Sequence, residues 1–333
     1  MIDPEQGTSI IESREFQEAS PNGQLRIEAI TKMHGSEVRE RHLTRIGTGC
    51  GISLLLLLPF GVAQNKLTKS PTEPAQELAR RVLANELKSE QQDHSHWMFL
   101  LKTYKPAGQT EVDQVIETKD GDIKRPVLIN GHGLSEEQRK KADQRLQQFT
   151  NDPSELRKAR SGEDEDTARS QELLKMLPDA FNFKYGQRRG KLVLLNFSPN
   201  PNFKPSSHEA EVFHAMQGSL WLDPKDNRLE EINGRLIREV KFGGGLLGHL
   251  DPGGTFDVKQ APVASGYWEL TLLHVEMKGK ALFFKTIGVQ QKYTRSNFKQ
   301  VPDDLPLAKA AEMLEKQKTP HHASDQQVNS KNK

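Results

Sequence analysis

Alternation of apolar and polar residues between positions 180 and 301 constrains the fold more than any other feature of this chain. Residues 181–185 carry apolar side chains at every second position, residues 191–197 carry them on both faces of a strand, and turn residues around Gly190 separate the two runs. A period of two is typical of β-strands, and two such runs joined by a short turn predict a hairpin. Because the pattern recurs along the whole stretch, it predicts an α+β protein built on a large antiparallel sheet.

The last predicted hairpin, formed by residues 268–277 and 281–293, is the longest, and it is apolar on both faces. A sheet face open to water carries mainly polar side chains, so both faces of this hairpin are expected to be covered. Two arrangements fit this pattern. One is a sheet with helices on one side and an ordinary core, and the other is a curved sheet whose inner face lines an apolar cavity. Residues 243–245, three glycines, are predicted to form the bulge or bend that a curved sheet needs.

A helix and three strands are predicted ahead of this region. Apolar residues from Ala75 to Leu87 recur every three or four positions, which predicts a helix over about residues 70–91, with a capping box that begins at Ser70. Strands are expected at 97–105, 111–118 and 123–129, and an Asp-Gly turn joins the second strand to the third. The strands are therefore expected to form a meander.

Residues 135–177 are rich in Lys, Arg, Glu and Gln and predict a helical insertion of two or three helices. Ser135 begins a second capping box, and Asp152-Pro153 is expected to break the insertion. The acidic stretch 161–166 is expected to be a solvated loop, because it lacks the ligand spacing of a calcium-binding loop. A short helix is expected over 307–316.

The longest uncharged apolar run, residues 46–63, is typical of a secretory signal peptide. Basic residues up to Arg45 precede it, five leucines form its centre, and Pro59 and the small residues before Gln64 suit cleavage after Ala63. A membrane anchor is the alternative, since the run is just long enough to span a bilayer. We therefore expect a protein of the periplasm or cell envelope, either released after export or anchored in the inner membrane.

The remaining chain divides around this run. Residues 1–45 are interpreted as a disordered extension, or as the result of a start assigned at Met1 in place of Met33. Residues 64–317 are expected to form a single α+β domain, and the polar tail 318–333 to be disordered. Cleavage after Ala63 would remove Cys50, the only cysteine, so disulfides and cysteine metal sites are not expected.

Neither the charge nor the motifs of the chain indicate nucleic-acid binding or catalysis. A net charge of +2 gives no basic face, so no nucleic-acid partner is expected. The eleven histidines form no His-Glu-x-x-His or comparable zinc spacing, and no Gly-x-Ser-x-Gly elbow presents a serine nucleophile. We expect no enzyme, no metal and no cofactor, and keep a hydrolase only as a third alternative.

The order of elements, together with the segment Gly218-Ser219-Leu220-Trp221-Leu222-Asp223-Pro224, resembles the outer-membrane lipoprotein carriers and sorting proteins, the LolA/LolB-like superfamily. The resemblance covers roughly residues 70–301 and implies an incomplete, strongly curved antiparallel barrel, closed by helices over an apolar cavity. It also implies that the partners are lipids or the acyl chains of lipoproteins. The long insertion and the glycines at 243–245 depart from the family, so no ligand contact is carried over.

These observations lead to one hypothesis and one alternative. The hypothesis is an exported envelope protein, related in function to lipoprotein sorting, that binds a lipid or acyl chains between the helix at 70–91 and inward-facing aromatic residues. The alternative is a structural or scaffolding envelope protein whose core is filled by its own side chains. An envelope protein partner is compatible with both. The candidate lining residues are Trp97, Phe99, Phe181, Phe183, Trp221, Trp268 and Phe284.

Overall fold

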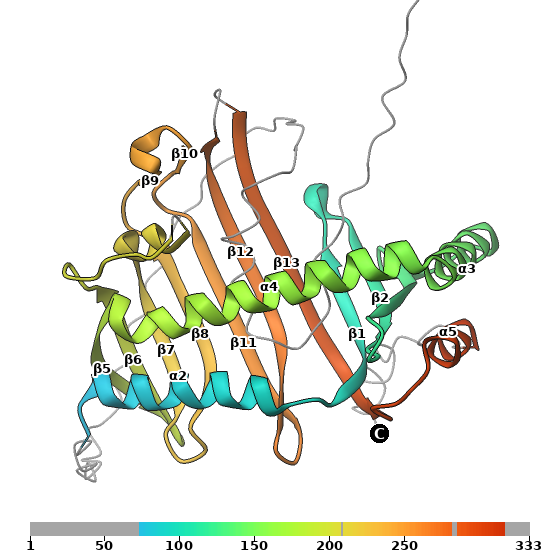
Figure 1. The fold of residues 1–333 in the computed structure, drawn as a ribbon, viewed down its shortest axis with the longest axis horizontal. Helices are drawn as coiled ribbons and strands as arrows, with labels where there is room; N and C mark the ends of the chain where they lie inside the picture. The colour runs from blue at the N-terminus through green and yellow to red at the C-terminus, as the bar shows by residue number, and fades with distance from the viewer. Residues whose placement is uncertain (1–72, 208, 282–284, 317–333) are drawn as a thin grey trace, which may run out of the picture.

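One antiparallel sheet organises the computed structural model, which describes residues 73–207, 209–281 and 285–316 (Figure 1). Thirteen strands belong to it, and its main path runs in the order β4-β3-β2-β1-β13-β12-β11-β8-β7-β6-β5. The strands are β1 (His96–Tyr104), β2 (Thr110–Ile116), β3 (Ile123–Ile129), β4 (His132–Gly133), β5 (Phe181–Arg189), β6 (Leu192–Pro199), β7 (Met216–Asp223), β8 (Arg228–Leu236), β9 (Val240–Phe242), β10 (Gly248–Leu250), β11 (Thr255–Ala264), β12 (Tyr267–Ala281) and β13 (Lys285–Val301).

The last long strand, β13, lies between the N-terminal strands β1–β4 and the strands that follow the helices. β13 pairs with β12 on one side and with β1 on the other, and Leu101 of β1 lies opposite Arg295 of β13. The path ends at β4 and at β5, and no pairing joins these two edges among the described residues. The predicted α+β fold with a large antiparallel sheet is therefore confirmed, and the sheet is not closed into a barrel.

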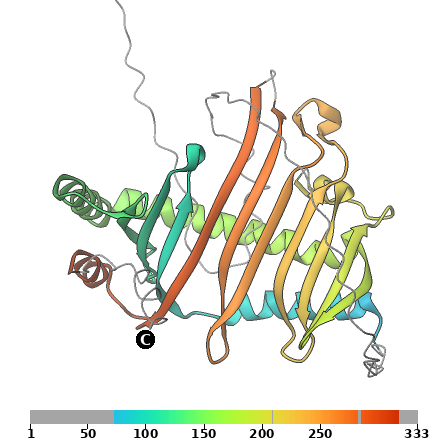
Figure 2. The same ribbon diagram turned by 180° about the vertical axis from the view of Figure 1, so that it is seen from behind.

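Helices α2 (Ala75–Gln92) and α4 (Pro153–Ala180) cross the same face of the sheet, which we call the helix-covered face (Figure 1). Figure 2 shows the strands from the other side, with these two helices behind them. Leu78, Val82 and Leu83 of α2 are buried in one apolar cluster with residues of the strands, as the predicted stripe requires. The capping box at Ser70 falls outside the described residues, and α2 begins after Pro74.

Helices α3 (Glu136–Asn151) and α5 (Leu307–Lys316) pack on the opposite face, beside β2 and β3. Neighbouring strand residues point to opposite faces. Trp97 belongs to the cluster beneath α2, whereas Met98 packs with Leu146 of α3 and Leu314 of α5. The expected placement of helices on one face therefore holds for α2 and α4 and not for α3 and α5.

The insertion is helical, as predicted, but its acidic part is not a loop. Ser135 and Gln138 form the reciprocal capping box of α3, and Asp152 caps α4 through the backbone N–H groups of Ser154 and Glu155. α4 then continues without a break through residues 161–166. A single interior glycine costs a helix only about 1 kcal/mol, and the surrounding Arg, Glu and Ala residues favour helix, so Gly162 does not end it.

The three glycines at 243–245 form a tight turn, η3 (Gly243–Gly245), between β9 and β10. All three have positive φ angles, which only glycine adopts without strain. The turn leaves Leu246, which follows it, 80% exposed. Two further short turns, η1 (Pro106–Gly108) and η2 (Glu209–Ala215), complete the described elements.

Candidate ligand-binding site

Four of the predicted lining residues lie on the helix-covered face, in one buried apolar cluster. Phe181 and Phe183 lie at the β5 edge, where the ring centroids of Phe181 and Phe197 are 4.6 Å apart. Trp97 and Phe99 lie on β1, where the ring of Phe298 packs 5.3 Å from that of Phe99. The structure therefore places these four aromatic residues in two groups, on well-separated strands of one face.

Two of the other three predicted residues, Trp221 and Trp268, are described, and neither belongs to this cluster. Trp221 stands between Leu220 and Leu222, which both belong to the cluster beneath α2, so its ring lies on the opposite face. There the guanidinium of Arg189 covers it at 4.4 Å from the ring centroid. Trp268 is half-buried, with the guanidinium of Arg228 at 5.3 Å from its ring. Phe284 lies outside the described residues.

The helix-covered face has two parts, the packed region and the central region. The packed region is the part beneath α2 and the C-terminal half of α4, where Leu173, Leu174 and Leu177 are buried. The central region is the apolar face of β1, β12 and β13. Its side chains point to the same face by their register, and they are Leu101, Leu273, Val275, Met277 and Tyr293.

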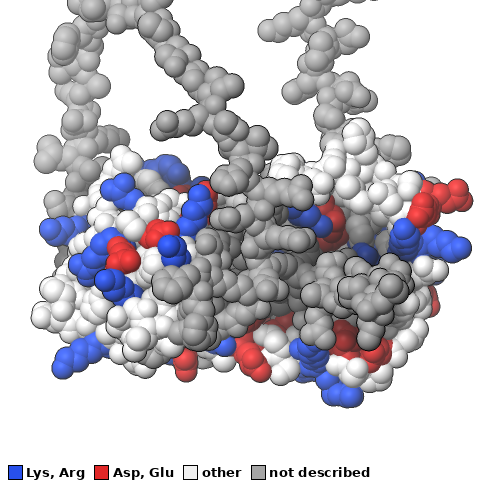
Figure 3. Space-filling view, turned by 90° about the horizontal axis from the view of Figure 1, so that it is seen from above, with Lys and Arg blue, Asp and Glu red and all other residues white. Residues whose placement is uncertain are grey.

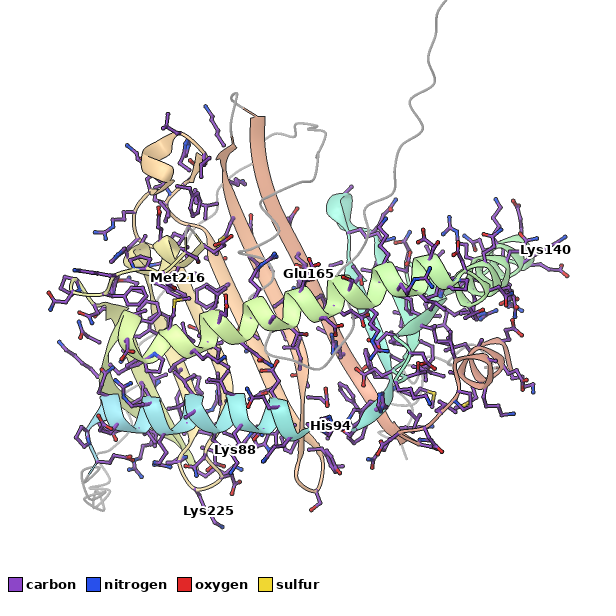
Figure 4. All side chains as sticks on the ribbon, viewed as in Figure 1. Lys88, His94, Lys140, Glu165, Met216 and Lys225 are labelled. Carbon is purple, nitrogen blue, oxygen red and sulfur yellow. The ribbon has the colours of Figure 1, made fainter. Side chains whose placement is uncertain are left out.

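α4 crosses the strands of the central region, whose side chains are buried. Figure 4 labels Glu165 where the helix passes in front of β12 and β13. The principal partners of α4 are nevertheless α2, α3, β5 and η2, and neither β12 nor β13 is among them.

The side of α4 that turns toward the sheet changes character along the helix. Leu177, Ser170 and Glu163 are buried and follow one another at intervals of seven residues, so they lie on one helix face. The buried residues of the C-terminal half include three leucines, whereas Glu163 is the only buried side chain described in α4 before Ser170. Over the central region the helix therefore turns polar groups toward the interior.

A first buried polar group links α2 to the sheet. The Glu86 carboxylate accepts hydrogen bonds from the Leu229 backbone N–H at 2.7 Å and from Gln260 Nε2 at 2.9 Å, and Arg228 Nε lies 3.1 Å from it. Gln260 also donates to the Leu229 carbonyl oxygen. Burial raises the pKa of Glu86, and the nearby Arg228 opposes that rise. Every oxygen of this carboxylate thus has a partner, as a buried charge requires.

Two further buried charged residues are Glu269 and Arg295, and the guanidinium of Arg295 is not satisfied in this way. Glu269 is 5% exposed and Arg295 is 3% exposed. Burial raises the pKa of Glu269 to about 8; Arg295 and Arg228 oppose this rise, while Asp93 and Asp122 add to it. The Nε, Nη1 and Nη2 atoms of Arg295 are all buried, and none has a hydrogen-bond partner among the described residues.

Arg295 points to the helix-covered face. It lies opposite Leu101, and its guanidinium carbon is 4.9 Å from the ring centroid of Phe99 and 5.6 Å from that of Tyr293. These rings contact the guanidinium through cation–π attraction, which leaves its N–H donors unused. The central region therefore combines an apolar strand surface with the buried N–H donors of Arg295, which the described residues do not use.

These polar residues are absent from the prediction, although one of them leaves a signal in the sequence. Glu86 follows Val82 by four residues and so falls on the apolar stripe of α2. Arg295 leaves none, because one arginine in a strand is ordinary in a chain with 47 Lys and Arg residues.

Other kinds of site find little support in the described part of the chain. It contains no group of three or more His, Cys, Asp or Glu residues placed to hold a metal ion. None of its helices combines the length and the apolar character needed to cross a membrane. On the described surface that is visible from above, both Lys or Arg and Asp or Glu side chains are present (Figure 3). Searches against family models, curated proteins and solved structures return no match.

Proposed function

We propose that the protein is a carrier that binds a lipid, or the acyl chains of a lipoprotein, between the central region of the sheet and α4. One observation carries the proposal: an apolar strand face is crossed by a helix segment that turns polar residues toward it and packs mainly elsewhere. Apolar side chains favour an apolar partner, by roughly 25 cal/mol per Å² of buried surface. An acyl chain would supply that partner.

The fold and the sequence support this proposal in different ways. An unclosed antiparallel sheet with helices across one face is compatible with the LolA/LolB-like architecture that the segment 218–224 resembles. Action in the periplasm or cell envelope rests only on the apolar run 46–63, which lies outside the described residues. The fold relationship and the location are parts of the same proposal.

Native mass spectrometry of the protein purified from an exporting host tests it. We expect an acyl lipid to copurify at a fixed stoichiometry, and the lipid-free protein to take up a fluorescent fatty acid. A clean apo mass together with no uptake would overturn the proposal.

A matched pair of substitutions locates the ligand. Val275→Trp places a large ring over the central region, whereas Ile232→Trp places one beneath α2, against which β8 packs. We expect Val275→Trp to block fatty-acid uptake, and, because Val275 is buried, to lower stability through overpacking as well. Ile232→Trp should cost about 1–3 kcal/mol of unfolding free energy through overpacking, and it should leave the uptake of the folded protein intact.

The second candidate is a structural envelope protein with a filled core. The close packing of aromatic rings at the β5 edge favours this second candidate. The ring centroid of Phe181 lies 4.6 Å from that of Phe197 and 5.4 Å from that of Phe213. For this candidate both tryptophan variants should lose stability to a similar extent, and neither protein should bind lipid.

A further inference from the structure

Arg295 is a buried cation whose hydrogen-bonding capacity is unused by the described residues. A guanidinium carries five N–H donors in a planar fork, and burying a charge without partners costs several kcal/mol. A native protein retains such a group where something else satisfies it, either water or a bound ion or ligand. Its place on the apolar central region favours a ligand with one polar end.

The residues around Arg295 leave its charge available. Arg228 forms an ion pair with Glu86. Glu269 forms neither a hydrogen bond nor an ion pair with Arg295 in the described structure. Burial raises the pKa of Glu269 and so favours the neutral form of its carboxyl group. The site therefore carries a positive charge that a negative group of a ligand can neutralise.

The apolar surroundings define the rest of the ligand. Leu101 lies directly opposite Arg295, and Leu273 lies opposite Tyr293 on the adjacent strand, so apolar side chains extend from the guanidinium across β1, β13 and β12. An arginine fork matches the two oxygens of a carboxylate or a phosphate. A molecule with such a head and an apolar tail would contact both parts of the site.

We propose that Arg295 binds the anionic head group of the ligand, so that the carrier selects acidic amphiphiles over neutral ones of the same chain length. This inference rests on the proposed carrier function and adds the chemical class of its ligand. The head group is a carboxylate, as in a fatty acid, or a phosphate, as in a lysophospholipid acid.

Displacement of a neutral naphthylamine probe from the full-length protein tests the inference. The competitors are palmitate, palmitoyl lysophosphatidic acid and cetyl alcohol, which share one chain and differ in the head. We expect at least one acid to displace the probe at a concentration about ten- to a hundredfold lower than the alcohol, the value of a charge-assisted hydrogen bond. The tighter acid identifies the head group. Equal displacement by the alcohol and both acids would overturn the inference.

Three variants test whether the preference for acids over the alcohol depends on the guanidinium of Arg295. Arg295→Met should lower the affinity for the acid to that for the alcohol and leave the alcohol within about twofold, because only the charged contact is lost. Arg295→Lys should keep part of the preference, since an ammonium retains the charge without the fork. Arg125→Met is the matched control, because Arg125 is buried on the opposite face and already paired with Asp143 at 2.6 Å.

The outcomes separate this inference from the carrier proposal. Retention of the full acid preference by Arg295→Met would overturn the role of Arg295 while the carrier proposal stands. Failure of the wild-type protein to bind the probe and all three lipids would overturn both. If Arg295→Met does not fold, the test uses the ratio between the displacing concentrations of the alcohol and the acid. This ratio should be smaller in Arg295→Lys than in the wild-type protein. A ratio unchanged by the lysine substitution would overturn the role of the guanidinium fork.

Discussion

The packed region and the central region belong to one face of one sheet, and they are covered by the same helix, yet they are built differently. In the packed region, leucines of α2 and α4 meet apolar strand residues and the aromatic group around Phe181. In the central region, similar strand residues lie beneath the polar part of α4 and beside Arg295. The difference therefore comes from the helix and from one strand side chain, and not from the sheet as a whole.

This contrast separates what stabilises the fold from what is available for binding. Burial of apolar groups against each other is the main favourable term in folding, and the packed region supplies it. A buried polar group without hydrogen-bond partners opposes folding, and the central region contains one among the described residues, the guanidinium of Arg295. Residues that reduce stability without a structural return are commonly found at functional sites. The comparison thus leads to predictions about stability as well as binding.

The largest effect is expected in the packed region. Phe181→Ala should lower the free energy of unfolding by about 3–5 kcal/mol, because it leaves a cavity among Phe183, Phe197 and Phe213. Urea unfolding measures the loss. Leu156→Ala, at a half-buried position in the N-terminal part of α4, is the control and should cost about 1 kcal/mol or less. Similar losses from the two variants would break the distinction between the packed region and the N-terminal part of α4.

Opposite effects are expected from substitution of Arg228 and of Arg295. Arg228→Met should cost about 3–5 kcal/mol, because it leaves Glu86 buried without its cation. Arg295→Met should raise the unfolding free energy of the ligand-free protein by about 1–3 kcal/mol, because it removes an unpaired charge from an apolar site. Both are measured by chemical unfolding without lipid. A large loss from Arg295→Met would show that the guanidinium supports the fold.

The pH dependence of stability tests the state of Glu269. Its pKa is raised from 4.5 to about 8 in the folded protein, so between these values the unfolded chain releases a proton that the folded protein keeps. Stability from this group is therefore complete below pH 4.5 and is lost as the pH rises toward 8. Glu269→Gln should reduce the slope in this window and raise stability at its upper end by a few kcal/mol.

Unfolding curves at several pH values follow this effect, and Glu172→Gln on the exposed side of α4 serves as the control. Part of the slope should remain in Glu269→Gln, because burial raises the pKa of Glu86 in the same direction. An unchanged slope would mean that Glu269 is already ionised beside Arg295. In that case the cation of the central region would have a partner within the protein.

Local sequence patterns predicted the parts of the fold that local interactions determine. The strand at 123–129 and the helix at 307–316 have the predicted bounds, and the hairpin of β5 and β6 joins segments that are adjacent in the chain. The capping box at Ser135 is also present. The pairing of β1 with β13 was not predicted, because it joins segments far apart in sequence and no local period specifies such a partner.

The same limit explains the candidate site. The apolar run Leu220-Trp221-Leu222 in β7 indicates that Trp221 is buried, but it does not say which face of the sheet the helices cover. Arg295 is buried only because β13 lies between β1 and β12, so its environment depends on pairing that the sequence pattern leaves open. Glu86 differs, because a charged residue on the apolar stripe of a helix can be recognised from the sequence as a candidate buried polar group.

The smallest effect is expected where α2 meets α4 at the surface. Arg80 Nη2 lies 2.9 Å from Asp179 Oδ1, and both side chains are largely exposed. Water and salt screen such a pair, so Arg80→Ala should change the unfolding free energy by about 0.5 kcal/mol or less, and the difference should vanish at high salt. A loss comparable with that of Phe181→Ala would mean that this ion pair, and not the buried leucines, holds α4 against α2. The contrast between the two regions would then no longer follow from which side chains they bury.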